Sequence, residues 1–282
     1  MIVFRKKDEL NAKISSLKEE NTTVGFVPTM GALHQGHLSL VEEALANNNL
    51  VVVSIFVNPT QFDNSEDLKK YPRNLQQDVD LLNTLSDKII VYAPTVEDIY
   101  EGETKSRKFN FDGLEHQMEG KFRDGHFDGV GTIVKLLFDI VKPNNAYFGE
   151  KDFQQLAIIK KLVSKYNILV NIVGCKIKRD ANGLALSSRN TRLKPEHKVV
   201  APFIYKTLKA AKEKFGTKSA NKVIEWVENQ FANHELFKLE YFTIADEATL
   251  KTVKRKSKNK QYRAFIAVYA GKIRLIDNIA LN

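Results

Sequence analysis

The sequence is poor in cysteine, since Cys175 is the single one in 282 residues. One thiol excludes an internal disulfide and a multi-thiolate metal site. A long apolar run is also missing: residues 50–57 form the best candidate, which is strand-sized, whereas a membrane-spanning helix needs about 18 residues. At the N-terminus, charges follow the first apolar residues where a signal peptide would continue with a hydrophobic stretch. We therefore expect a soluble, cytoplasmic protein with no membrane contact.

The sequence also lacks internal repeats and low-complexity segments. Hydrophobic residues make up 43% of it and charged residues 27%, with 14 Gly and 7 Pro, which excludes a disordered or fibrous chain. A chain of this length can bury a sizeable core and predicts one large domain or two modest ones.

The formal net charge of +9 is concentrated in one place. Residues 251–263, the basic segment, contain seven basic residues and no acidic one, so seven of the nine net positive charges come from here. Such a segment could bind an anion or a polynucleotide. Because a basic run of this kind is a weak nucleic-acid signal, we interpret it as a solvated loop between two strands and expect no nucleic-acid partner.

The first part of the chain alternates strands and helices. Residues 23–29 and 50–57 are typical of buried strands, and residues 38–46 between them of a helix, which together predict a right-handed βαβ unit. The alternation continues with helices at 75–85, 129–141 and 152–166 and strands at 88–92, 146–148 and 168–177. This pattern predicts an α/β domain with a mainly parallel sheet in residues 1–180.

The second part has a different pattern. Two amphipathic helices, 195–215 and 219–233, precede three strands, 239–245, 262–270 and 272–277, of which the last two are joined by a Gly-Lys hairpin. This predicts a smaller α+β domain in residues 181–282. The boundary is expected in the polar segment between Lys178 and Arg192, which contains an Asn-Gly pair.

The most specific pattern is His-x-Gly-His within residues 28–38, PTMGALHQGHL. It follows the first buried strand and opens a helix, at the edge where α/β sheets bind ligands and where a helix presents N–H groups. Gly36 allows close approach, and His34 and His37 can both donate hydrogen bonds to one phosphate chain. We favour phosphate binding over two alternatives, which are histidines that only cap the helix and a zinc site without the usual i, i+4 pair.

Two further segments suit a nucleotide. Residues 184–190, LALSSRN, place two hydroxyls and a guanidinium in the inter-domain segment, where they could hold a triphosphate. Residues 148–155, FGEKDFQQ, end a strand and open a helix, with Lys151 as a candidate phosphate ligand and Asp152 as a candidate for ribose hydroxyls. Taken alone, each segment could also be a helix cap.

Two other segments suit a small substrate. Residues 56–62, FVNPTQF, place Gln61 beside aromatic rings, which suits a small polar molecule. Residues 119–129, EGKFRDGHFDG, form a glycine-shaped loop in which Arg123 and His126 could line a carboxylate site. An Asn-Pro turn and surface salt bridges are the alternative interpretations.

Together these motifs resemble, in order and spacing, those of the pantothenate synthetase (pantoate–β-alanine ligase) family. The resemblance rests on PTMGALHQGH, FVNPTQF, YPR at 71–73, EG-x-x-R-x-GHF-x-GV, FGEKD-x-QQL and LSSRN. It covers nearly the whole chain and is densest over residues 24–192. It implies a Rossmann-like N-terminal domain, related to class I aminoacyl-tRNA synthetases, and a smaller C-terminal domain that covers the site. The sequence departs from the family's pattern at three positions. Leu186 stands where methionine is common, Asp124 where proline is common, and Lys178 where an apolar residue is common.

The resemblance also implies residue roles. ATP would be bound by Met30, Gly31, Ala32, Leu33, His34, Gln35, Gly36, His37, Gly149, Glu150, Lys151, Asp152, Lys178, Leu186, Ser187, Ser188 and Arg189. Gln61 and Gln155 would bind pantoate, Gln61 also lying near β-alanine, with Arg123 and His126 close to that pocket. His37 would be the proton donor, and His34, Lys151 and Arg189 would complete the catalytic set.

The implied reaction joins pantoate to β-alanine. ATP first converts pantoate to pantoyl adenylate with release of pyrophosphate, and the amine of β-alanine then displaces AMP to give pantothenate. The implied cofactor is Mg²⁺, which accompanies ATP without a metal site built by the protein. A homodimer is implied as well.

Two other functions stay open. One is another His-x-Gly-His adenylyltransferase that acts on a cofactor precursor, which would release pyrophosphate without forming an amide. The other is a synthetase-like RNA-binding protein that uses the basic segment, for which binding would fall steeply with salt.

Overall fold

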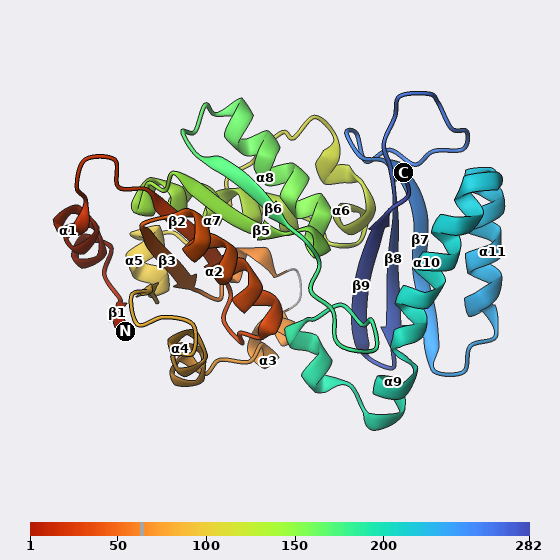
Figure 1. Ribbon diagram of the computed structural model, residues 1–282, viewed down its shortest axis with the longest axis horizontal. Coiled ribbons are helices and arrows are strands. Elements are labelled where there is room, and N and C mark those ends of the chain that lie inside the picture. The colour runs from red at the N-terminus through yellow and green to blue at the C-terminus, as the bar shows by residue number, and fades with distance from the viewer. Residues whose placement is uncertain (63–64) are drawn as a thin grey trace. The chain divides into compact units, whose positions relative to one another are not determined.

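The computed structural model describes residues 1–62 and 65–282. They form two compact units, labelled by element in Figure 1. The first unit comprises Met1–Glu150 and Gln154–Lys176, and the second comprises Lys151–Phe153 and Ile177–Asn282. The predicted fold class, an α/β part with a mainly parallel sheet followed by a smaller α+β part, is confirmed. The assignment of ATP and pantoate binding to residues 1–180, and of a lid to residues 181–282, remains a prediction.

The first unit contains a six-stranded sheet in which every neighbouring pair is parallel. Its spatial order is β1 (Ile2–Phe4), β4 (Ile90–Tyr92), β3 (Leu50–Ile55), β2 (Val24–Thr29), β5 (Asn145–Gly149) and β6 (Asn171–Cys175). From β2 the chain proceeds outward through β3 and β4, and then returns to the other side of β2 with β5. The order therefore reverses between β2 and β5, and sheets of this type bind ligands beyond the carboxyl ends of the strands at such a point.

Both faces of this sheet are covered by helices. The helices are α1 (Lys7–Leu17), α2 (Gln35–Asn47), α3 (Ser65–Lys70), α4 (Leu75–Asn83), α5 (Val96–Tyr100), α6 (Met118–Phe122), α7 (His126–Val141) and α8 (Phe153–Lys165). Val27 of β2 belongs to a core cluster with Val41 of α2 and Leu82 of α4. Its neighbour Phe26 points to the opposite face, where its ring lies 6.3 Å from that of Phe138 in α7. Burial on both faces explains why β2 and β3 are almost wholly apolar.

The N-terminal strand β1 was not among the predicted strands. It pairs in parallel with β4, Ile2 opposite Ile90 and Phe4 opposite Tyr92. Three residues give too short a pattern for a strand to be read from periodicity alone. The same corner holds the buried Asp98, which accepts hydrogen bonds from the Tyr92 hydroxyl at 2.7 Å and from the Lys7 backbone N–H at 3.1 Å. One carboxylate thus joins β4, α5 and the start of α1.

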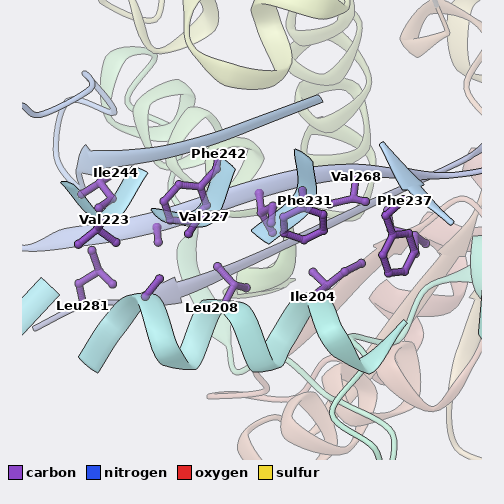
Figure 2. Packing of buried hydrophobic residues seen from close by; sticks show 14 of the residues in the cluster. Ile204, Leu208, Val223, Val227, Phe231, Phe237, Phe242, Ile244, Val268 and Leu281 are labelled. Atoms are coloured by element: carbon purple, nitrogen blue, oxygen red, sulfur yellow. The ribbon is translucent and has the colours of Figure 1, made fainter. Parts of the chain in front are cut away.

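The second unit is an antiparallel three-stranded sheet with helices against it. Strands β7 (Phe237–Asp246), β8 (Tyr262–Ala270) and β9 (Ile273–Ala280) lie in sequence order, and the hairpin from β8 to β9 turns at Gly271, whose φ is +60°. Figure 2 shows Ile204 and Leu208 among the buried side chains of this unit, together with Val268 of the sheet. Apolar residues at helical spacing on α10 and α11 thus complete this core.

The predicted helix 195–215 is two helices, α9 (Pro195–Val200) and α10 (Pro202–Thr217). Pro202 lacks an N–H and therefore breaks the helix, although it suits the first position of α10. The next helix is α11 (Ala220–Ala232), which the sequence predicted within a residue at each end.

A short hairpin opens the main part of the second unit. Arg179 and Ala185 form an isolated bridge, and the chain turns at Gly183, whose φ is +97°. The Arg179 guanidinium donates to both oxygens of the buried Asp277, at 2.6 and 2.8 Å. Burial raises the pKa of Asp277, and the hydrogen bonds from Arg179 oppose that rise.

The helices of residues 1–62 and 65–282 fall short of the requirements of a membrane span. None of them combines the length and the apolar character that such a span needs.

We predict that Tyr92→Phe lowers the free energy of unfolding by about 1–2 kcal/mol, because it removes a donor from a buried carboxylate. Burial and the neighbouring Asp98 raise the pKa of Tyr92, so the hydroxyl stays protonated as a donor throughout the accessible pH range. The measurement is urea denaturation followed by circular dichroism. Tyr166→Phe, at a residue that is 44% exposed, is the matched control and should leave the free energy of unfolding unchanged. Equal midpoints for both variants would contradict the prediction.

Candidate active site

The turn between β2 and α2 carries the His-x-Gly-His motif. Its first residues adopt left-handed backbone conformations, with φ +77° at Gly31 and +51° at Ala32. The Gly31 N–H donates to the Thr29 hydroxyl at 3.2 Å, and that hydroxyl donates to the Ser54 carbonyl at 2.7 Å. The end of β2 and the beginning of the turn are thereby fixed to β3.

His34 is the N-cap of α2. Its Nδ1 accepts a hydrogen bond from the Gly36 backbone N–H at 3.1 Å. A neutral imidazole that accepts at Nδ1 carries its proton on Nε2, which is therefore a hydrogen-bond donor. The rings of His34 and His37 are stacked at a tilt, with centroids 4.1 Å apart. His34 thus caps the helix through Nδ1, which leaves Nε2–H as the donor that phosphate binding would need. Phosphate binding by this residue stays a prediction.

The start of α2 favours an anion in two ways. Its first turn, all of it within the described residues, contains no acidic side chain. The backbone N–H groups there also give the helix N-terminus a partial positive charge. An anion bound here would meet backbone dipoles together with the two imidazoles.

Gln61 is positioned through its backbone. It ends a short 3₁₀ turn (Pro59–Gln61), and its carbonyl accepts hydrogen bonds from His126 Nδ1 at 2.8 Å and from Arg123 Nη2 at 3.3 Å. Arg123 Nη1 and His126 Nε2 are 3.1 Å apart, which fits an Arg donor and a ring protonated on Nδ1. The structure thus brings these three predicted residues together, with Arg123 and His126 on the main chain of Gln61.

The two adjacent glutamines of the FGEKD-x-QQL motif differ in their surroundings. The buried Gln154 donates to the carbonyls of Leu114 and Gln117, both at 2.8 Å, and accepts from the Glu119 N–H at 3.0 Å. Its amide is used in holding this loop. Gln155, the predicted pantoate ligand, is partly exposed. Gly149 and Glu150 are also partly exposed, where β5 ends.

Lys151 and Asp152 belong to the second unit. Lys151 Nζ lies 3.6 Å from Asp152 Oδ1, and its side chain is 18% exposed. The Lys151 carbonyl accepts a hydrogen bond from Asn278 Nδ2 at 2.9 Å. The oxygen of that amide accepts in turn from Arg263 Nη1 at 2.7 Å, and the Arg263 guanidinium lies 4.0 Å from the centroid of the Phe153 ring. A residue of β9 and one of β8 therefore hold this segment.

The basic segment divides into two parts. Residues 251–260 form a mainly exposed loop between β7 and β8, as predicted. Lys260 at the end of this loop pairs with Asp246, the last residue of β7, at 2.9 Å. Arg263 is different, because it is buried in β8 and bonded to Glu247 and Asn278. Of the seven basic residues in the basic segment, Arg263 thus supports the Lys151 carbonyl through Asn278.

The LSSRN motif follows the hairpin of the second unit. The Leu186 N–H donates to the carbonyl of the exposed Lys178 at 3.0 Å. Ser187 Oγ accepts from the Arg189 N–H at 3.3 Å and caps a 3₁₀ turn (Ser188–Arg192). Ser187 therefore caps this turn, and its role in holding a triphosphate stays a prediction. Ser188 and Arg189 are partly exposed.

A model of the family described as pantoate-beta-alanine ligase matches residues 2–280. The chain belongs to the pantoate–β-alanine ligase family. It is 63% identical over 282 residues to the pantothenate synthetase of Flavobacterium psychrophilum and 57% identical to that of Christiangramia forsetii, with 100% of each chain covered in both cases. The predicted family and enzyme class are confirmed.

Solved structures agree with this family assignment. A pantoate–β-alanine ligase (pantothenate synthetase) from Thermus thermophilus is 39% identical with a TM-score of 0.91, covering 100% of this chain and 99% of its own. The ligase from Francisella tularensis, complexed with beta-gamma ATP and beta-alanine, is 36% identical with a TM-score of 0.80, covering 100% and 98%.

The sequence pointed to Asn58 only as part of FVNPTQF and gave it no role of its own. Asn58 is fully buried, accepts from the Tyr100 hydroxyl at 2.6 Å and donates to the Gly129 carbonyl at 3.4 Å. Gly129 itself lies so close that a Cβ there would be 2.1 Å from the Thr60 carbonyl oxygen. A glycine inside the strongly apolar α7 was the available sequence signal for this close approach.

We predict that Gly129→Ala lowers pantoate-dependent AMP formation by this ligase roughly a hundredfold, because the new Cβ pushes against the turn that carries Gln61 and a 1 Å misplacement has an effect of that size. The matched control is Gly216→Ala, also in a helix, where a Cβ meets nothing within 4 Å. The measurement compares initial rates for both variants. A Gly129→Ala enzyme as active as the control would show that the turn can shift without harm.

Proposed function

We propose that this protein condenses pantoate with β-alanine, using ATP and giving pantothenate, AMP and pyrophosphate through a pantoyl-adenylate intermediate. The observation that carries the proposal is the His34–His37 pair at the N-terminus of α2, beyond the carboxyl end of β2, in a chain that matches the ligase family over residues 2–280. The Francisella relative complexed with a form of ATP and β-alanine supports the same two ligands here.

In the first step an oxygen of the pantoate carboxylate attacks the α-phosphorus of ATP. A new P–O bond forms, the bond to the β-phosphate oxygen breaks, and negative charge grows on the departing pyrophosphate. The chain's task is to align two anions and to stabilise that charge with donors already in place. His34 Nε2–H, His37 with its proton, Lys151 and Arg189 take that role in our proposal, with the hydroxyls of Ser187 and Ser188.

In the second step the unprotonated amine of β-alanine attacks the acyl carbon of the adenylate. The C–N bond forms, the C–O bond to AMP breaks, and the proton that the nitrogen loses passes to water. Gln61 and Gln155 hold the pantoyl group during both steps, and Arg123 and His126 act on it through the Gln61 carbonyl. Cys175 takes no part, since burial raises the pKa of its thiol to about 11.

The residues present fit a Mg²⁺ that arrives with ATP. Among residues 1–62 and 65–282, no three His, Cys, Asp or Glu side chains are grouped to hold a metal ion. Mg²⁺ is commonly bound by substrate phosphates and water, so such a group is not required. Lys151 and Arg189 would hold the complex through its phosphates, and the metal would supply charge neutralisation on pyrophosphate.

Two further expectations stay predictions. They are the homodimer and the cytoplasmic location.

The test is an AMP-release assay with ATP, Mg²⁺ and pantoate, run with and without β-alanine. AMP formation that requires both co-substrates, with pantothenate detected by mass spectrometry, is the expected result. Pyrophosphate release without an amide product would point to another adenylyltransferase. Absence of turnover by folded protein would overturn the proposed substrates.

We predict that His37→Ala lowers the rate of adenylation roughly a hundredfold or more, the range seen when one preorganised donor is removed. The rate is measured as pantoate-dependent pyrophosphate release. His116→Ala is the control, because that side chain is 78% exposed in the same unit. Near-normal turnover by His37→Ala, with an unchanged circular dichroism spectrum, would remove His37 from the catalytic set.

A further inference from the structure

One buried carboxylate lies against the turn that carries the two histidines. Asp78 on α4 is 3% exposed and comes 45 residues after Leu33 in the chain. Its Oδ1 accepts a hydrogen bond from the Leu33 backbone N–H at 2.7 Å, and its Oδ2 accepts one from the Ala32 N–H at 3.0 Å. The carboxylate thus binds two successive amides of the motif.

The backbone of the turn is shaped for this contact. Successive residues in special conformations such as those of Gly31 and Ala32 make neighbouring N–H groups converge into a concave site for an anion. A Cβ on Gly31 would lie 2.9 Å from Asp78 Oδ2, so the carboxylate takes the space that glycine leaves. The anion that this concave backbone binds is therefore part of the protein.

The turn borders a cavity on one side. This cavity has a volume of about 400 Å³ and is lined by Met30, Gly31 and Asp78 among others, whereas Leu33 packs against the core cluster that contains Val27 and Val41. The Asn74 side chain accepts from the Gln77 N–H at 3.1 Å and holds the start of α4. Asp78 therefore projects from a capped helix toward a turn beside a cavity.

The contact favours the ionised carboxylate. Burial raises the pKa of Asp78 above its usual value, and the hydrogen bonds from the Leu33 and Ala32 N–H groups oppose that rise in part. A proton on either oxygen would face an N–H donor and cost one of the two bonds. An asparagine at position 78 would also lose one of the two bonds, because its side-chain amide presents one oxygen and one NH₂ group.

We propose that Asp78 is a positioning residue for adenylation, which fixes His34 and His37 by holding the Ala32 and Leu33 amides. Leu33 directly precedes His34, the residue that caps α2, so a displacement of this turn moves the imidazole pair. The inference rests on the proposed function of that pair. Asp78 acts through the backbone and has no contact with the reactants in this proposal.

The first experiment compares Asp78→Asn with Asp80→Asn, using pantoate-dependent pyrophosphate release at saturating ATP. Asp80 lies on the same helix but is exposed, and it bonds only to Gln76 among the contacts described, so the control makes the same charge change away from the turn. We expect a roughly hundredfold lower rate for Asp78→Asn, as for a misplaced catalytic group, and an unchanged rate for Asp80→Asn. Rates within twofold of each other would overturn the proposal.

A double-variant cycle with His37→Ala separates positioning from general destabilisation. If Asp78 acts through the histidines, Asp78→Asn should cost less than about threefold once His37 is already removed, because residues that act as a unit are not additive. The same roughly hundredfold loss in both backgrounds would mean that Asp78 has a merely structural role.

Amide hydrogen exchange in the unaltered protein keeps the proposal testable if Asp78→Asn does not fold. We expect the Ala32 and Leu33 amides to exchange at least about a hundredfold more slowly than unprotected amides, because both are bonded to a buried carboxylate. Exchange at the unprotected rate would overturn the contact. If the unaltered enzyme forms no pantothenate, the proposed function fails, while the exchange result still decides the contact.

Discussion

The left-handed turn between β2 and α2 is the constraint on which the candidate site depends. β2 pairs with β3 through six residues and is buried on both faces, and the Thr29 hydroxyl donates to the Ser54 carbonyl, so the end of the strand is fixed. Within five residues the chain must leave this strand and start α2 with His34 as its cap. Gly31 accepts the required φ of +77° and leaves space for the carboxylate behind it, which no residue with a Cβ could do.

The candidate site repeats one structural device, which is to hold motif residues by their main chain. Asp78 binds amides next to His34, His126 and Arg123 bind the carbonyl of Gln61, and Asn278 binds the carbonyl of Lys151. The main-chain positions of His34, Gln61 and Lys151 are thus set by partners other than their own side chains. Preorganisation of this kind is worth most where charge develops during the reaction.

The sequence predicted the parts of this structure that have a local signal. The buried strands β2 and β3, the helix that opens at the His-x-Gly-His motif and the antiparallel second unit all follow from periodicity and turn residues. The three residues of β1 did not have such a signal. The break between α9 and α10 did have one, Pro202 itself, but the prediction of a single helix over 195–215 followed the amphipathic pattern and passed over the proline. Asp78 and Asn278 could not be predicted either, because their partners lie 45 and 127 residues away in the chain.

Strand β9 gives the second unit its organisation. Its consecutive residues Asp277 and Asn278 bind two different segments: Asp277 pairs with Arg179 at the base of the hairpin that leads to Leu186, and Asn278 holds Lys151. Because Asp277 is buried, the loss of Arg179 would leave its carboxyl group without this partner, which is destabilising. Two motif segments 35 residues apart are therefore attached to one dipeptide. The proposed phosphate ligands of this unit, Lys151 and residues 186–189, thus lie on segments that share one supporting strand, which is a form of preorganisation.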